Sequence, residues 1–455
     1  MGGGYLQLSG VGPQDIYLTG NPQITYFKAV YKRYTNFSID TFSLFTTNMD
    51  FGKISEIEIP INGDLITNLH LEVKLPQLHQ TQHGDTITQY ASWVNGLGNA
   101  LIKNVTLKIG GLEIDKHYGE WLDIWSELNI KKEKKENYDL MINNTYPSDD
   151  ADPENYKSLH PITLYIPLRF WFNNNPGLAL PLIALQYHKV TINFEFEDAK
   201  NLVRSNVDIS IPRAVDSNIA KFLDCKLLID YIYLDSDERR RFTQVPHEYL
   251  IETLQHSGSV VIPSGSEQFN LDLNFNNPVK YLVWVIQNAN YLKNNSSPNA
   301  TTNNASNDFK RKNCGNQKLR YSAVQNINGN YETFKEAKIQ IEGQDRITER
   351  SADYFRIVQN STYMDCVPSK HIYTYSFSLN PNKHQPSGSC NFSRFTDKVL
   401  NLIFDTTTQS LNKTSDNNPV YYTGQTQQEL EIKIYAVNYN ILRIMSGTAG
   451  LAYTN

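Results

Sequence analysis

The chain has 455 residues, more than the roughly 250 to 300 at which a single hydrophobic core stops growing, so its length predicts two domains. Lysine and arginine number 42 against 47 acidic residues, and the formal charge of -5 gives the whole molecule no attraction for a phosphate backbone. The four cysteines are widely spaced without a C-x-x-C pair, which argues against a zinc ribbon or a disulfide framework and indicates a reducing compartment.

The first predicted element is a short amphipathic helix within residues 18–37, "LTGNPQITYFKAVYKRYTNF". Asn21 suits the N-cap and Pro22 the first helical position, where its missing N–H would be unpaired anyway. Aromatic side chains then recur at helical spacing, and the basic residues are too sparse for a nucleic-acid or membrane-surface helix. Packing on the first domain and anchoring between subunits both remain open. The candidate contact residues are Asn21, Pro22, Phe27, Lys28, Tyr31, Lys32, Arg33 and Tyr34.

The dominant hydrophobic period along the rest of the chain is two, which is typical of half-buried strands. In residues 69–75, "LHLEVKL", four apolar side chains alternate with polar ones, so one face lies in a core and one in water. Long helical patterns are few, and the pattern therefore predicts an all-β protein. The same alternation occurs in residues 105–109, 164–172, 269–275, 337–341 and 430–437.

The two halves of the chain carry a repeated strand–turn–helix pattern. Residues 105–125 align with residues 337–358, and changes of offset elsewhere are explained by insertions at 131–158 and at 288–330. A charged segment, residues 234–250, separates the halves as a linker or short helix. The repeat predicts two antiparallel domains of about 200 residues with eight or so strands each, as in a sandwich or jelly roll.

The sequence contains no phosphate-binding loop, no H-E-x-x-H and no G-x-S-x-G motif, so no catalytic residue, cofactor or metal is predicted. His79 and His83 lie four apart in a polar segment without a helical pattern, and His117 with Glu120 offers no better metal site.

The Asn-rich insertion cannot bury enough apolar area to join a core, and we expect an exposed loop that carries function or faces a partner. N-x-[ST] sequons are plentiful along the chain, and those in this loop are the geometrically suitable candidates for surface glycans. The sequence shows no secretory signal, so we expect that the chain does not reach the usual glycosylation machinery. The candidate glycan sites are Asn294, Asn295, Asn299 and Asn304.

Several long stretches, in one order, resemble the double jelly-roll major capsid proteins of the nucleocytoplasmic large DNA viruses. The resemblance covers nearly the whole chain and lapses at the two insertions, where such proteins vary. The stretches are residues 18–37, 96–125, 177–192, 234–255, 386–396 and 438–453.

The resemblance implies an N-terminal arm (1–37) with the short helix, followed by two tandem eight-stranded antiparallel jelly rolls, residues 38–235 and residues 236–455, the second with the long loop 288–330. It implies homotrimers of pseudo-hexameric outline that tile the icosahedral outer shell of a virion, after synthesis in the host cytoplasm. Penton proteins, minor capsid proteins and the inner viral membrane are the implied partners, with no direct nucleic-acid binding. The arm would lie on the inner face and the long loops outside.

A jelly-roll protein that binds or cleaves carbohydrate is the alternative. Abundant tyrosine together with tryptophan suits sugar stacking, but no pair of acids recognisable as a glycosidase pair is found. A shell protein, by contrast, needs complementary interfaces and no catalytic residue.

Overall fold

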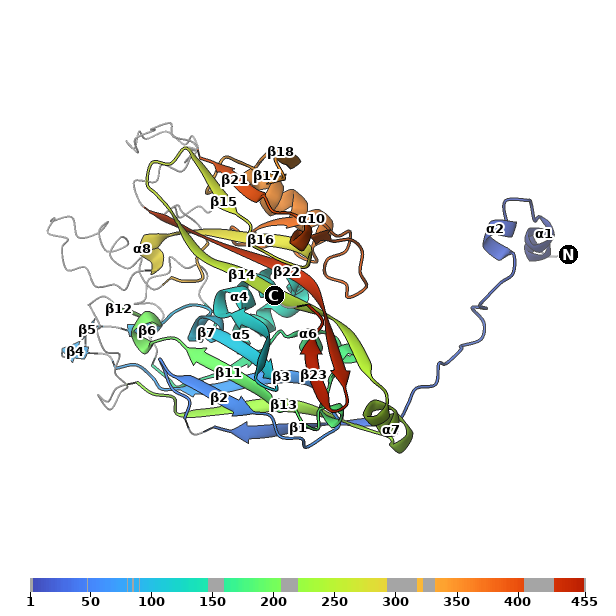
Figure 1. The fold of residues 1–455 in the computed structure, drawn as a ribbon, viewed down its shortest axis with the longest axis horizontal. Coiled ribbons are helices and arrows are strands. Elements are labelled where there is room, and N and C mark those ends of the chain that lie inside the picture. The colour runs from blue at the N-terminus through green and yellow to red at the C-terminus, as the bar shows by residue number, and fades with distance from the viewer. Residues whose placement is uncertain are drawn as a thin grey trace. The chain divides into compact units, whose positions relative to one another are not determined.

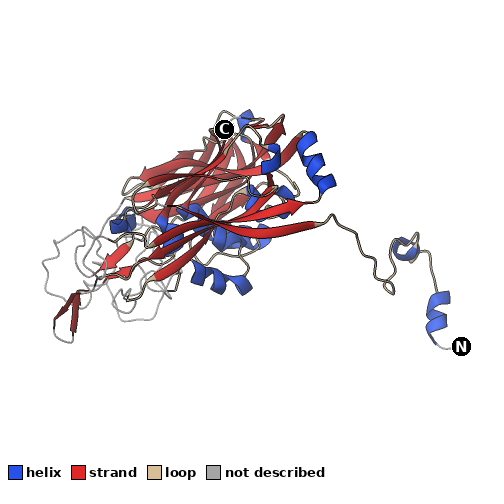
Figure 2. Cartoon of the chain, turned by 90° about the horizontal axis from the view of Figure 1, so that it is seen from below, coloured by secondary structure: helices blue, strands red, loops and turns tan. Residues whose placement is uncertain are grey.

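A computed structural model of the chain describes residues 3–46, 48–79, 81–83, 86–89, 91–145, 159–205, 220–292, 317–321, 332–404 and 429–453. The chain divides into two units, residues 1–37 and residues 38–455. The larger unit is dominated by strands, with short helices between them (Figure 2).

The smaller unit contains two short helices, α1 (Gly3–Ser9) and α2 (Ile16–Thr19), while the described residues 20–36 contain no helix. The helix predicted from Asn21 is therefore wrong. Asn21 has a φ of +49°, in the left-handed region, whereas an N-cap residue takes an extended backbone. A helix this short is marginal in water unless one face is buried, and here the aromatic side chains are exposed.

The first half of the larger unit consists of two antiparallel sheets that share one core (Figure 1). One sheet contains β1 (Phe37–Phe45), β13 (Asp224–Leu234), β3 (Leu65–Leu75), β9 (Ile162–Pro167) and β10 (Leu180–Pro181). The other contains β2 (Ile54–Glu58), β11 (Val190–Phe196), β7 (Ile102–Ile109) and β8 (Leu112–Tyr118). The predicted alternation in residues 69–75 is confirmed, because Leu69, Leu71, Val73 and Leu75 are buried.

The second half repeats this arrangement. One sheet contains β14 (His247–Ile262), β22 (Leu430–Met445), β16 (Pro278–Asn288), β19 (Tyr373–Ser376), β20 (Cys390–Asn391) and β23 (Thr448–Leu451). The other contains β15 (Gln268–Asp272), β21 (Lys398–Ile403), β17 (Glu336–Ile341) and β18 (Gln344–Ser351). The pairing order β14-β22-β16-β19 corresponds to β1-β13-β3-β9, and β15-β21-β17-β18 corresponds to β2-β11-β7-β8. Each half is thus an eight-stranded jelly roll with short additional strands, as predicted.

The predicted repeat is visible residue by residue in one hairpin of each half. β7 and β8 are joined by Gly110 and Gly111, and β17 and β18 by Glu342 and Gly343; all four residues have positive φ. A two-residue hairpin turn of this type requires positive φ at both positions, which explains why glycine recurs there. A helical segment follows in both halves, α4 (Gly119–Asn129) and the π-helical turn with α10 (Gln359–Tyr363).

The remaining elements lie in the connections. The predicted linker contains an exposed helix, α7 (Ser236–Gln244), whose N-cap Asp235 accepts a hydrogen bond from the backbone N–H of Ser236. Among the described residues, no helix has the length and apolar character needed to cross a membrane. The connecting elements are α3 (Leu97–Leu101), α5 (Lys132–Met141), α6 (Trp171–Asn174), α7 (Ser236–Gln244), α8 (Ala289–Leu292), β4 (Thr81–His83), β5 (Thr86–Gln89), β6 (Ala91–Trp93) and β12 (Val203–Ser205).

Candidate functional site

The junction between the two jelly rolls is built on β16 and β22, which are buried on both faces. Alternate residues of β16 point to opposite faces: Leu282, Trp284 and Ile286 pack in the core of the second jelly roll, whereas Tyr281 and Val283 pack in the core of the first. A strand covered on both faces appears in sequence as a continuous apolar run rather than an alternation. Residues 281–286, "YLVWVI", form such a run. This run indicates a strand at a domain junction, which was not predicted from the sequence.

Helix α4 brings two acids into this junction. Asp123 Oδ2 lies 2.7 Å from Lys370 Nζ, and Glu127 accepts hydrogen bonds from both the backbone N–H and the hydroxyl of Ser369. Lys135 Nζ lies 2.9 Å from Glu127 Oε1. Burial raises the pKa of Asp123 against the opposing effect of Lys370, whereas at Glu127 burial is outweighed by Lys370 and Lys135, which lower the pKa.

A second polar contact joins the start of α4 to β22. Glu120 Oε1 lies 2.7 Å from Lys433 Nζ, and the hydroxyl of Tyr435 donates to Glu120 Oε2 at 3.2 Å. Lys433 also donates to the amide oxygen of Gln287 on β16. These groups are hydrogen-bonded at the junction, so they fix how α4 sits on the second jelly roll.

Two further contacts fix the junction through backbone groups. The buried carboxylate of Asp115 on β8 accepts from the backbone N–H of Leu254 on β14 at 3.0 Å. At the hairpin between β22 and β23, Tyr187 donates its backbone N–H to the carbonyl of Gly447, and Ala449 donates to His188 Nδ1. The two jelly rolls are therefore held in one compact unit by core packing, ion pairs and backbone hydrogen bonds together.

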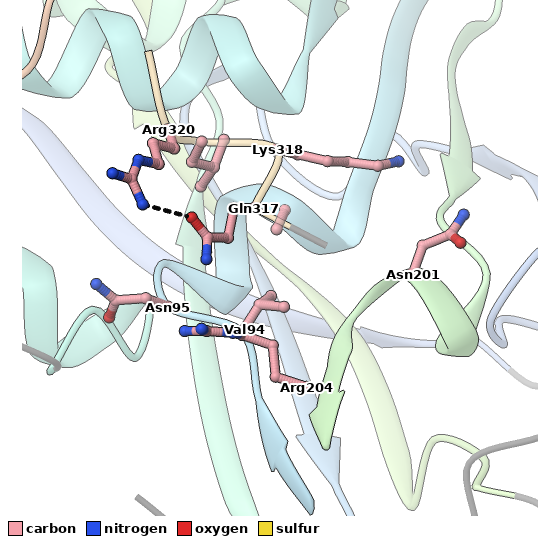
Figure 3. A pocket seen from close by; sticks show the side chains of 9 residues that line it. Val94, Asn95, Asn201, Arg204, Gln317, Lys318 and Arg320 are labelled. Carbon is pink, nitrogen blue, oxygen red and sulfur yellow. Dashed lines mark hydrogen bonds between the residues drawn. The ribbon is translucent and has the colours of Figure 1, made fainter. Parts of the chain in front are cut away.

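A small basic pocket lies where residues 317–321 approach β6 and β12 (Figure 3). Arg320 donates to the amide oxygen of Gln317, and Arg204 from β12 lies on the opposite wall beside Val94. Lys318 contacts the carboxylate of Glu197. The pocket has a volume of about 20 Å³, enough for a water molecule and too small for a cofactor.

A larger hollow, about 530 Å³, adjoins this pocket and opens between the halves. His256 stacks on Tyr435 at its wall with ring centres 4.4 Å apart, and burial lowers the pKa of His256, which favours a neutral imidazole. The lysines that line it, Lys103, Lys318 and Lys433, each contact a carboxylate. The charged groups here are thus paired within the chain.

The predicted contact residues of the N-terminal segment are solvent-exposed. Phe27, Tyr31 and Tyr34 are 98%, 87% and 83% exposed, and the neighbouring Tyr26 is 90% exposed. The other predicted contact residues are exposed as well, namely Asn21, Pro22, Lys28, Lys32 and Arg33. The segment presents a concentration of aromatic surface, but without the helix that was expected to organise it.

The other sequence candidates have different outcomes. Asn294, Asn295, Asn299 and Asn304 lie outside the described residues. His117 Nε2 lies 2.9 Å from Asp115 Oδ2, and Glu120 contacts Lys433, so these two residues belong to the junction. In the part of the chain that the structure describes, no histidines, cysteines and acids are grouped as a metal site would require.

Comparison with known proteins identifies the class. Residues 25–235 match the family described as "Major capsid protein N-terminus", and residues 238–450 match "Large eukaryotic DNA virus major capsid protein". The two matches together span most of the chain, and the fold is the double jelly roll of such shell proteins. The chain belongs to the family of major capsid proteins of large eukaryotic DNA viruses.

Individual relatives are similar over their full length. The major capsid proteins of Pyramimonas orientalis virus and Paramecium bursaria Chlorella virus 1 are each 39% identical to this chain, with complete coverage of both sequences. The crystal structure of PBCV-1 VP54 superimposes with a TM-score of 0.75 at 34% identity, covering 95% of this chain and all of that one. The Faustovirus major capsid protein, at 12% identity and a TM-score of 0.68, shares the fold. These relatives confirm the expectation of a structural rather than an enzymatic protein.

Proposed function

We infer that this major capsid protein assembles into homotrimers and that these capsomers tile the icosahedral shell of a virion. The observation that supports this most is the repeated strand order of the two jelly rolls within one compact unit. Three copies of such a chain present six similar domains, which gives a nearly hexagonal outline suited to close tiling. Domain duplication allows the two jelly rolls to differ where their surroundings differ.

The proposed domain division is an arm (1–37), a first jelly roll (38–235) and a second jelly roll (236–455) with the loop 288–330. We propose that the arm contacts the inner layer, either minor capsid proteins or the inner viral membrane. Its many exposed aromatic residues support this, because exposed apolar surface of this extent marks an interaction site. Penton proteins would meet the capsomers at the shell's vertices.

The net charge of -5 supports a shell without direct nucleic-acid binding. We propose synthesis in the host cytoplasm and a place in the outer capsid shell. On this proposal the Asn-rich loop is exposed on the outside, where Asn294, Asn295, Asn299 and Asn304 would be accessible to sugar transfer.

Native mass measurement of the purified chain, followed by electron microscopy, tests the proposal. We expect a mass of three chains and hexagonally outlined particles that form flat arrays. A stable monomer with measurable affinity for sugars would instead favour the carbohydrate-binding alternative and contradict capsomer assembly.

A further inference from the structure

A crevice at the junction of the jelly rolls is distinct from the ion pairs described above. Its inner part has a volume of about 40 Å³ and its outer part about 230 Å³. Trp125 of α4 and Trp171 of α6 come from the first jelly roll, whereas Glu252 of β14 and Tyr281 of β16 come from the second. Because these four residues line both parts, the two hollows form one crevice, called here the junction crevice.

The inner part of the junction crevice contains a guanidinium that has no carboxylate partner among the described residues. The Cζ atom of Arg169 lies 4.3 Å from the centre of the Trp125 ring, and its buried Nε has no hydrogen-bond acceptor among the described residues. Glu252, the acid in the described lining, is already held by Lys280, whose Nζ lies 2.5 Å from Oε1. Within the described part of the chain, the lining therefore carries a positive charge that no acid compensates.

Other buried polar atoms in the same lining are also unpaired. Thr253 is 2% exposed and His117 is 4% exposed, yet Thr253 Oγ1 and His117 Nδ1 have no hydrogen-bond partner in the described part of the chain. The same is true of both amide atoms of Asn382, which lines the outer part. Native proteins satisfy nearly all such groups, so a cluster of them beside an unpaired arginine indicates a site for a polar group from another molecule.

We propose that the junction crevice binds an acidic side chain carried by a peptide segment of a partner protein, with Arg169 as its anchor. Charge complementarity supports a carboxylate, because a guanidinium donates two parallel hydrogen bonds to that group. The hydroxyl of Thr253 and the amide of Asn382 can donate to the same ligand. The indole rings exclude water and so strengthen the ion pair.

The size of the junction crevice favours a peptide side chain over a sugar acid. The outer part is smaller than the roughly 300 to 1,000 Å³ of pockets that enclose whole small molecules, and it suits one or two side chains. A sugar acid offers the same carboxylate, and Trp125, Trp171 and Tyr281 can stack on its ring, but the whole ring would have to enter this volume, whereas a peptide inserts one side chain. The amide of Asn382 can both donate to and accept from a peptide backbone.

Calorimetric titration of the full-length chain tests the proposal with three probes: the blocked tripeptide Gly-Glu-Gly, its Gly-Gln-Gly counterpart, and glucuronic acid. We expect the glutamate peptide to bind at least about tenfold more tightly than the other two, because only it combines a carboxylate with a backbone. Equal binding of the glutamate and glutamine peptides would overturn the proposal, as would absence of binding by all three. Tighter binding of glucuronic acid would reassign the crevice to sugars and overturn the peptide assignment.

Two variants and a control locate the binding. Arg169→Met should weaken the glutamate peptide at least about tenfold, whereas Arg350→Met, at an exposed arginine of β18, should leave it unchanged. Because Arg169→Met also removes the stacking on Trp125, its unfolding temperature is measured in parallel. Asn382→Ala at the outer part keeps that stacking and should weaken the peptide several-fold. Unchanged affinity in both crevice variants would refute the assignment.

Discussion

Lys370 Nζ lies 2.7 Å from Asp123 Oδ2, and the two residues come from different jelly rolls. Asp123, at the centre of α4, is 1% exposed, so its charge is separated from water and depends on this partner. The corresponding helical segment of the second jelly roll, residues 354–363, makes no such contact with an acid of the first among the contacts of the described residues. The duplicated strand–turn–helix unit has therefore acquired, in one copy, the side chains that hold the two copies together.

Replacement of this lysine tests the contribution of the contact. We expect Lys370→Met to lower the free energy of unfolding by roughly 3 kcal/mol, because removing one member of a buried ion pair leaves the other charge unpaired. Chemical denaturation measures the loss. Lys383→Met, at an exposed lysine of the same jelly roll, is the control and should have almost no effect. Equal midpoints for the two variants would show that Asp123 is not dependent on Lys370.

The pH dependence of stability should contain a contribution from Glu332. Burial and a hydrogen bond with Asp353 raise the pKa of Glu332 from 4.5 to about 7, although Arg356 opposes this. Between pH 4.5 and about pH 7, Glu332 keeps its proton in the folded chain but releases it in the unfolded chain. The stabilisation from Glu332 is therefore fully present below pH 4.5 and is lost as the pH rises to about 7. Its full size is on the order of 3 kcal/mol.

The variant Glu332→Gln removes the titrating group and keeps the shape. Denaturant unfolding at pH 4.5 and at pH 7.5 should show that the wild-type protein loses stability relative to this variant as pH rises. Glu349→Gln, at an exposed position of β18, serves as the control and should keep the wild-type pH profile. Parallel profiles for the wild-type protein and Glu332→Gln would contradict a raised pKa.

Period-two alternation in residues 69–75 predicted a half-buried strand correctly, because burial on one face is a local property of a strand. The repeat was also predicted correctly from the matching turn glycines Gly111 and Gly343. The hairpin turn itself requires a positive φ at these positions, whatever the rest of the fold. The prediction of a helix beginning at Asn21 was wrong for the opposite reason. Its cap and spacing were suitable, but a helix of this length depends on burial against another surface, which the local pattern does not specify.

The junction was harder to predict than the sheets. Asp123 and Lys370 are separated by 247 positions, and nothing in their local sequence links them. Arg169 looked like an ordinary polar residue in the alternating stretch 164–172, whereas its unpaired burial depends on Trp125 and on β14 of the other jelly roll. Contacts made by the folding of distant segments leave little trace in one sequence.

Alanine substitutions at two glycines can distinguish the stability cost of a positive φ from the cost of a steric clash. One of these glycines lies in the turn of the β22–β23 hairpin. Gly447 has a φ of +80°, and a Cβ placed on it would lie 2.6 Å from the Tyr187 ring. Gly265 has a φ of +79°, and a Cβ placed on it would meet no atom of the described residues within 4 Å. We expect Gly265→Ala to cost about 1 kcal/mol for the positive φ alone, and Gly447→Ala to cost about 3 kcal/mol because overpacking adds to it. Unfolding curves compare the two, and equal losses would show that Tyr187 moves aside freely.

The N-terminal segment should contribute to assembly rather than to folding. No residue of α1 or α2 is buried, and the aromatic side chains of residues 24–34 are exposed, so removal of residues 1–36 should change the free energy of unfolding by less than about 0.5 kcal/mol. Particle formation, examined by electron microscopy, should be impaired because the exposed aromatic surface is lost. A full-length variant with Tyr26, Phe27 and Tyr31 replaced by serine keeps the chain length and should show the same defect. Closed particles of normal size from both proteins would refute a role for this segment in attachment to the inner layer.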